Sequence, residues 1–115
     1  MGHSAVHSDN PLCCPVVETL RLLGGKWKPM LIHQLLEAPQ QFGQLQRRLS
    51  PISHKVLTEQ LRELENAGLV ARDVGEERVV TVTYQLTESG QALRPVLDSM
   101  FAWADVFLAE ADSTV

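Results

Sequence analysis

The chain has little of what marks secreted, membrane-spanning or generally basic proteins. Two Cys in 115 residues exclude a disulfide framework, and both are expected to be reduced. Acidic residues outnumber basic ones by 14 to 10, so no overall positive charge attracts nucleic acid. No run approaches the ~20 apolar residues of a membrane span, and the first residues lack the pattern of a secretion signal. We expect a cytoplasmic protein without membrane contact.

A single compact domain suits this length and a hydrophobic content of 44%. We expect the domain over residues 13–115, after a flexible N-terminal arm over residues 1–12, where no periodic pattern is present. Charge is unevenly distributed, because residues 42–62 carry a net charge of +3 and the remainder carries −7. This basic segment is compatible with nucleic-acid binding and equally with a solvated helix face.

Helical periodicity dominates the first half of the domain, in four segments that each end at a helix-breaking residue. These segments are about 15–23, 27–37, 42–49 and 54–67, ended by Gly24-Gly25, Pro39, Ser50-Pro51 and Gly68. Stretches rich in Val, Thr and Tyr over 69–74 and 79–86 then predict a β-hairpin. Thr87 is expected to cap one long last helix from about Glu88 to Ala109.

This order of elements is that of a winged helix-turn-helix. We expect a mainly α (α+β) fold with a two-stranded β-hairpin wing and a long C-terminal helix. The second helix of the helix-turn-helix, capped by Ser53, would lie in the major groove of DNA. The open alternatives are a helical domain with an ordinary solvated face and a winged-helix protein-interaction module without specific DNA binding.

Candidate DNA contacts lie on the helix-turn-helix and the wing. Hydroxyls, hydrogen-bond donors and guanidinium groups there suit phosphates and base edges. The candidates are Gln44, Arg47, Arg48, Ser53, His54, Lys55, Thr58, Glu59, Arg62 and, in the wing, Arg78. Among them, Arg62 is the candidate for reading a guanine and Arg47 for holding a phosphate.

Segments spread along the chain resemble the HxlR-type transcriptional regulators. They are Cys14-Pro15-Val16, Gly24-Gly25-Lys26-Trp27, Phe42-Gly43-Gln44-Leu45, Ile52-Ser53-His54-Lys55-Val56-Leu57-Thr58, Leu61-Arg62-Glu63-Leu64-Glu65, Gly68-Leu69-Val70 and Tyr84-Gln85-Leu86-Thr87-Glu88-Ser89-Gly90. The resemblance implies a homodimer, expected to be a repressor, on double-stranded operator DNA of two-fold symmetry. The sequence departs from the family pattern in the wing, where Arg78 lies beside Glu76 and Glu77. We therefore expect the tip of the wing to approach DNA phosphates poorly.

The resemblance also implies dimerisation through the first and last helices. The last helix carries more apolar side chains than one small domain needs to cover, which agrees with a dimerisation helix. The expected interface residues are Val16, Leu20, Val96, Met100, Trp103 and Phe107. A small-molecule or electrophile inducer is a further expected partner.

Cys14 is expected at the start of the first helix, where free N–H groups and the helix dipole favour a thiolate. Some members of the resembled family sense oxidants or electrophiles through a Cys at this position, so Cys14 is a candidate redox sensor. Cys13 would serve at most as a resolving thiol, and a bond between these neighbours would need a strained eight-membered ring. The alternative is that Cys14 is a small packing residue.

Neither a metal site nor catalysis is expected. His3, His7, Cys13 and Cys14 are zinc-ligand types, but their spacing matches no closed four-ligand pattern. The sequence contains no carboxylate pair, nucleophile–base grouping or Gly-rich phosphate loop. We therefore expect no enzyme activity, no cofactor and no metal.

Overall fold

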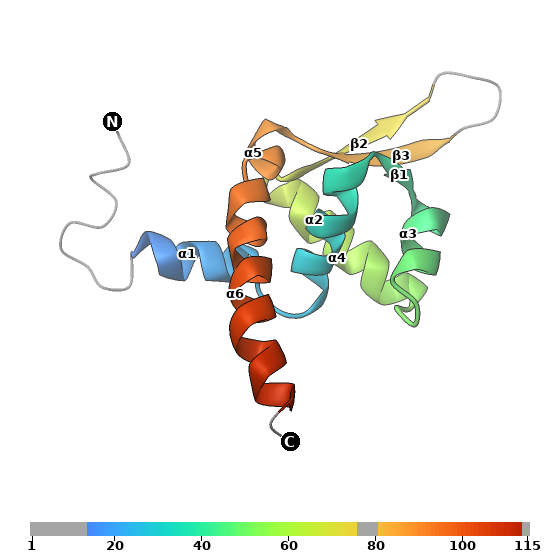
Figure 1. The fold of residues 1–115 in the computed structure, drawn as a ribbon. Coiled ribbons are helices and arrows are strands. Elements are labelled where there is room, and N and C mark those ends of the chain that lie inside the picture. Colours follow the sequence, from blue (N-terminus) through green and yellow to red (C-terminus); the bar gives the residue numbers. More distant parts are fainter. Residues whose placement is uncertain (1–13, 76–80, 114–115) are drawn as a thin grey trace.

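The computed structural model describes residues 14–75 and 81–113. The elements in chain order are α1 (Pro15–Leu22), α2 (Trp27–Glu37), β1 (Gln40–Gln41), α3 (Phe42–Arg48), α4 (His54–Asn66), β2 (Val70–Val74), β3 (Val82–Leu86), α5 (Glu88–Gln91) and α6 (Arg94–Ser113). Figure 1 shows α2, α3 and α4 beneath the small sheet, with α6 beside them and α1 projecting away on the other side of α6. The mainly helical fold with a β-hairpin wing is confirmed.

The sheet is antiparallel with strand order β1-β3-β2. The β2–β3 hairpin is the wing, and its register runs from Val70 opposite Leu86 to Val74 opposite Val82. A third strand, β1, adds Gln40 opposite Tyr84, which the sequence analysis did not anticipate. Two glutamines carry no alternating apolar pattern, yet the Gln40 side chain is buried and its Nε2 donates to the Gln34 carbonyl oxygen at 2.8 Å. The wing is therefore tied to the end of α2.

The hydrophobic core lies between α2, α3, α4 and the sheet. Its completely enclosed side chains all come from the three helices and are Leu31, Ile32, Leu35, Leu45, Leu57, Leu61 and Leu64. The expected caps are confirmed: Ser53 Oγ accepts from the Val56 N–H at 3.1 Å, and Thr87 Oγ1 accepts from the Gly90 N–H at 3.2 Å. The apolar stripe of α4 thus faces inward and leaves its opposite face to solvent.

The expectation of one uninterrupted last helix is wrong. The chain forms a single turn, α5, which ends at Gln91, and α6 begins at Arg94. Pro95 explains the break, because it has no N–H to donate to the Gln91 carbonyl oxygen and its ring clashes with a continuous helix there. Because of the break, α5 can pack against strand β3 while α6 extends past α2 (Figure 1).

Gly90 in α5 is a position where a methyl group does not fit. An added Cβ would lie 2.3 Å from the Leu69 carbonyl oxygen and 3.1 Å from the Leu86 side chain. That carbonyl oxygen already accepts from the Thr87 N–H at 3.0 Å, so it cannot move away freely. We expect Gly90→Ala to lower the free energy of unfolding by ~1–3 kcal/mol, measured by urea denaturation.

The matched control for this substitution is Gly43→Ala in α3. Its added Cβ would meet only the flexible end of Arg47, at 3.5 Å. Because Ala is the better helix former by ~1 kcal/mol, this variant should be as stable as the wild type or more so. A Gly90→Ala variant that unfolds at the wild-type urea midpoint would contradict the packing described for α5.

Candidate nucleic-acid interface

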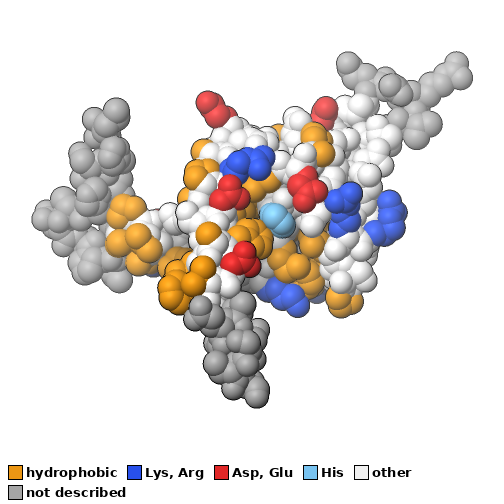
Figure 2. All heavy atoms as spheres, in the orientation of Figure 1, with side chains coloured by type: hydrophobic (Ala, Val, Ile, Leu, Met, Phe, Trp, Pro, Cys, Tyr) orange, Lys and Arg blue, Asp and Glu red, His pale blue; other side chains and the backbone are white. Residues whose placement is uncertain are grey.

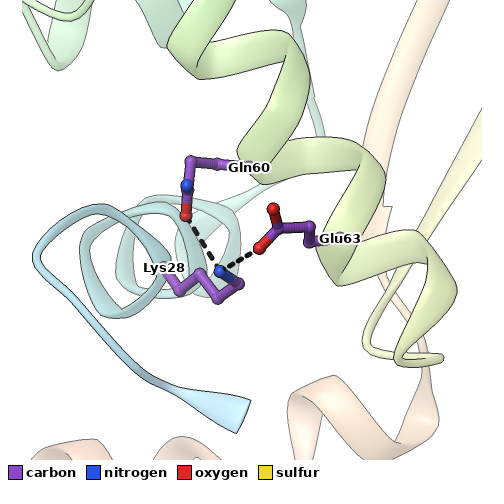
Figure 3. A network of polar contacts seen from close by, with 3 residues as sticks. All are labelled: Lys28, Gln60 and Glu63. Atoms are coloured by element: carbon purple, nitrogen blue, oxygen red, sulfur yellow. Dashed lines mark hydrogen bonds and ion pairs between the residues drawn. The ribbon is translucent and has the colours of Figure 1, made fainter. Parts of the chain in front are cut away.

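The helix-turn-helix is formed by α3, a turn and α4, and α4 is held from behind by α2. Lys28 of α2 donates from Nζ to Gln60 Oε1 at 3.1 Å and forms an ion pair with Glu63 Oε1 at 2.5 Å (Figure 3). The Lys28 side chain is only 15% exposed, so solvent screens this pair weakly. These contacts fix the orientation of α4 relative to the body and leave its outer face free.

Several predicted DNA contacts use their polar atoms inside the helix-turn-helix. Ser53 caps α4, Thr58 Oγ1 donates to the His54 carbonyl oxygen at 2.8 Å, and Gln44 Oε1 accepts from the Gln41 N–H at 2.9 Å. The His54 ring lies against the Phe42 ring, with centroids 4.7 Å apart. These residues stabilise the first turns of α3 and α4. Among them, only Ser53 was predicted from the sequence to have such a role.

Apart from Arg48, the predicted contacts with exposed charged groups are Arg47, Lys55, Glu59 and Arg62. Among the side chains of residues 14–75 and 81–108, none of these four forms an ion pair. Arg48 differs, because its Nη1 lies 3.7 Å from Glu37 Oε1 and donates to Gln34 Oε1 at 3.3 Å. Figure 2 shows Lys and Arg side chains gathered on the side of the molecule where α3 lies. The three unpaired cations are thus available to an external polyanion.

A polar pocket that the sequence analysis missed opens between α4 and the root of the wing. It has a volume of about 300 Å³ and is lined by Thr58, Arg62, Glu65, Asn66, Arg72 and Tyr84. The register places Arg72 directly opposite Tyr84, so both side chains leave the same face of the sheet. The predicted wing contact, Arg78, lies outside the described residues.

The predicted dimer-interface residues lie on an apolar surface formed by α1 and α6. Five of the six are exposed, with Trp103 57% and Phe107 54% accessible, and Val96 is half-buried. Val16, Leu20, Val96 and Met100 line a shallow apolar groove of about 280 Å³ between the two helices. Figure 2 shows hydrophobic side chains on α1 and α6 at the surface. The protomer leaves this surface uncovered.

Cys14 is the N-cap residue of α1 and is half-buried. Its carbonyl oxygen accepts from the Glu18 N–H at 3.1 Å, so the thiol lies at the first turn as expected. Cys13, His3 and His7 lie outside the described residues. Within the described part of the chain, no group of three or more His, Cys, Asp or Glu side chains could hold a metal ion.

A second apolar cavity, of about 280 Å³, lies between α2 and α6. Half-buried His33 lines it and contacts the Phe101 ring, with centroids 4.7 Å apart. Leu49 at the end of α3 also lines the cavity, which therefore borders the helix-turn-helix. None of the helices described is long and apolar enough to span a membrane.

Comparison with known proteins agrees with this geometry. The model of the HxlR-like helix-turn-helix family matches residues 22–112. The HTH-type transcriptional regulator YodB of Bacillus subtilis (strain 168) is 39% identical over 104 residues, which cover 90% of this chain and 93% of YodB.

Two solved structures are similar to this fold. The redox regulator HypR in its oxidised form superimposes with a TM-score of 0.75 at 39% identity, covering 80% of this chain and 95% of HypR. The reduced form of YodB gives a TM-score of 0.75 at 43% identity, covering 82% of this chain and 93% of YodB. The resemblance found in the sequence is confirmed: the chain belongs to the HxlR-like helix-turn-helix family of DNA-binding transcriptional regulators.

Proposed function

We propose that this regulator is a homodimeric repressor whose two α4 helices bind the half-sites of a two-fold symmetric operator. The observation that carries the proposal is the set of three exposed cations on α3 and α4, Arg47, Lys55 and Arg62, which form no ion pair with the side chains that the structure describes. Cations of this kind bind phosphates and base edges without first breaking an internal ion pair. Membership of a family of transcriptional regulators favours DNA over the protein-interaction module that the sequence left open.

The operator can be recovered by sequencing genomic fragments that the purified protein retains. Fragments sharing an inverted repeat, with half-sites about one helical turn apart, would support the proposal. Retention of random fragments only, with equal affinity, would contradict sequence-specific regulation.

Release from the operator is the second part of the proposal, and we assign it to Cys14. The residue is half-buried, and it directly precedes Pro15, which lines the groove between α1 and α6. A bulky or polar group attached there would change how α1 meets a partner subunit and so alter the spacing of the two α4 helices. The similarity to HypR, which is described as a redox regulator, supports this assignment.

Two chemistries fit a single reactive thiol. Diamide removes two electrons and two protons from two thiols, so it would join Cys14 to a cysteine of a second subunit through one new S–S bond. A quinone would instead add the Cys14 sulfur to a ring carbon, so that a C–S bond replaces the S–H bond and the ring takes up the thiol proton and an electron pair to become a hydroquinone thioether. Either product enlarges the side chain at the start of α1.

We expect diamide or a quinone to lower the operator affinity of the wild type at least tenfold. The Cys13→Ser variant should respond as the wild type does, and Cys14→Ser should bind equally well before and after treatment. Affinity is measured by fluorescence anisotropy on a recovered fragment, and reduction of the diamide-treated wild type should restore it. A response that persists in Cys14→Ser would leave Cys14 as a packing residue and direct the search for an inducer to the apolar cavities beside α6.

A further inference from the structure

The polar pocket at the wing root brings together two arginines that lie on two different elements of the fold. Arg62 projects from α4 and Arg72 from β2, and α4 packs against β2. Thr58, Arg62 and Asn66 recur every four residues, so they lie along the side of α4 that lines this pocket. The pocket therefore lies where the recognition helix and the wing meet.

The charges in this pocket are not matched internally. Both arginines are exposed, and neither forms an ion pair with a side chain of residues 14–75 or 81–108. One carboxylate, Glu65, also lines the pocket, so two positive charges face one negative charge. An anion is the ligand that this balance favours.

Tyr84 adds a hydrogen-bond donor to the same pocket. The residue is 9% exposed, and over the described residues its hydroxyl has no hydrogen-bond partner. A phenolic O–H and two guanidinium forks together offer more donors than a single oxygen accepts, which suits the several acceptor oxygens of one phosphate. A planar carboxylate would need only one of the two forks.

We infer that Arg62 and Arg72 together bind one backbone phosphate of the operator, with the Tyr84 hydroxyl as a third donor. The inference rests on the DNA-binding function and identifies where the wing root meets the duplex. Thr58 and Arg62 lie on α4, the helix that enters the major groove, so the phosphates beside that groove are the nearest anions. Arg62 is thereby a positioning contact, whereas the sequence suggested that it reads a guanine.

The probe that tests this site is a duplex of about 30 base pairs with mixed sequence, because a phosphate contact carries no sequence information. Affinities of the full chain are measured by fluorescence anisotropy over a range of KCl concentrations. We expect Arg72→Ala to weaken binding on the order of tenfold and to reduce the slope of log Kd against log[KCl] by up to about one unit. Arg72→Lys should keep the slope, and Glu65→Gln should strengthen binding.

The matched control is Arg21→Ala, which removes an exposed arginine of α1 that is paired with Glu18 at 3.1 Å. This variant should retain the wild-type slope, and circular dichroism should show that each variant is folded. The double variant Arg62→Ala/Arg72→Ala should lose less affinity than the two single losses combined, because both side chains bind one group.

Three results would count against the site, and they are distinguishable. A folded Arg72→Ala variant with the wild-type slope would overturn this inference and leave the DNA-binding function intact. A wild type whose affinity for the duplex does not depend on salt would overturn the binding of DNA through this surface altogether. Arg62→Ala adds a third readout, because relaxed preference at one operator position, with other positions unchanged, would assign Arg62 to a base instead of a phosphate.

Discussion

The triple variant Arg47→Ala/Lys55→Ala/Arg62→Ala should lose operator affinity on the order of a thousandfold and remain folded. The three side chains are exposed and form no ion pair over the described residues, so their removal breaks no such contact in the protomer. Each lost contact to phosphate or base is worth roughly tenfold, and the salt slope should fall by up to about three units. Anisotropy titrations with a recovered operator fragment measure both effects.

The control for lost charge is the double variant Arg21→Ala/Lys26→Ala, which removes cations from the α1 end of the chain. Arg21 lies in α1, where it is paired with Glu18, and Lys26 directly precedes α2, so neither belongs to the helix-turn-helix. This variant should bind the operator within about twofold of the wild type, because distant exposed charges are screened. Unchanged affinity in the triple variant would remove α3 and α4 from the DNA interface.

Most of the fold could be predicted because local signals and the hydrophobic pattern agree. The leucine stripe of α4 and its Ser53 cap predict both that the helix forms and which of its faces is buried. The structure shows both as expected. The two misses have local physical causes. The strand β1 is too short to show a pattern, and Pro95 interrupts an apolar periodicity that otherwise continues through the last two helices.

The candidate site was less accessible to sequence reasoning because its polar groups have competing uses. A helix face can be predicted from spacing, but whether Gln44 caps α3 or Arg48 pairs with Glu37 is decided by three-dimensional contacts. The pocket at the wing root depends on the strand register that puts Arg72 opposite Tyr84, and on the packing of β2 against α4. Spacing along the sequence does not predict that side chains of α4 and of the wing line one pocket.

The surface of α1 and α6 leads to the second large effect, on assembly. We expect the wild type to sediment as a dimer without detectable monomer at micromolar concentration, and the variant Trp103→Asp/Phe107→Asp to sediment as a monomer. The two rings are more than half exposed in the protomer and lie 5.3 Å apart, so they form one apolar patch on α6. Burying two carboxylates in a symmetric interface costs several kcal/mol for each copy of the patch.

The same variant separates assembly from folding and from DNA contact. Its core is complete without these rings, because the fully enclosed side chains lie on α2, α3 and α4, so the far-ultraviolet circular dichroism should be unchanged. Val74→Asp is the matched control, since Val74 is 45% exposed on the wing strand β2 and should leave the dimer intact. A monomer presents one α4 at a time, so affinity for the two-half-site operator should collapse towards that for a single half-site. A wild type that sediments as a stable folded monomer would contradict the assignment of this surface to a second copy of the chain.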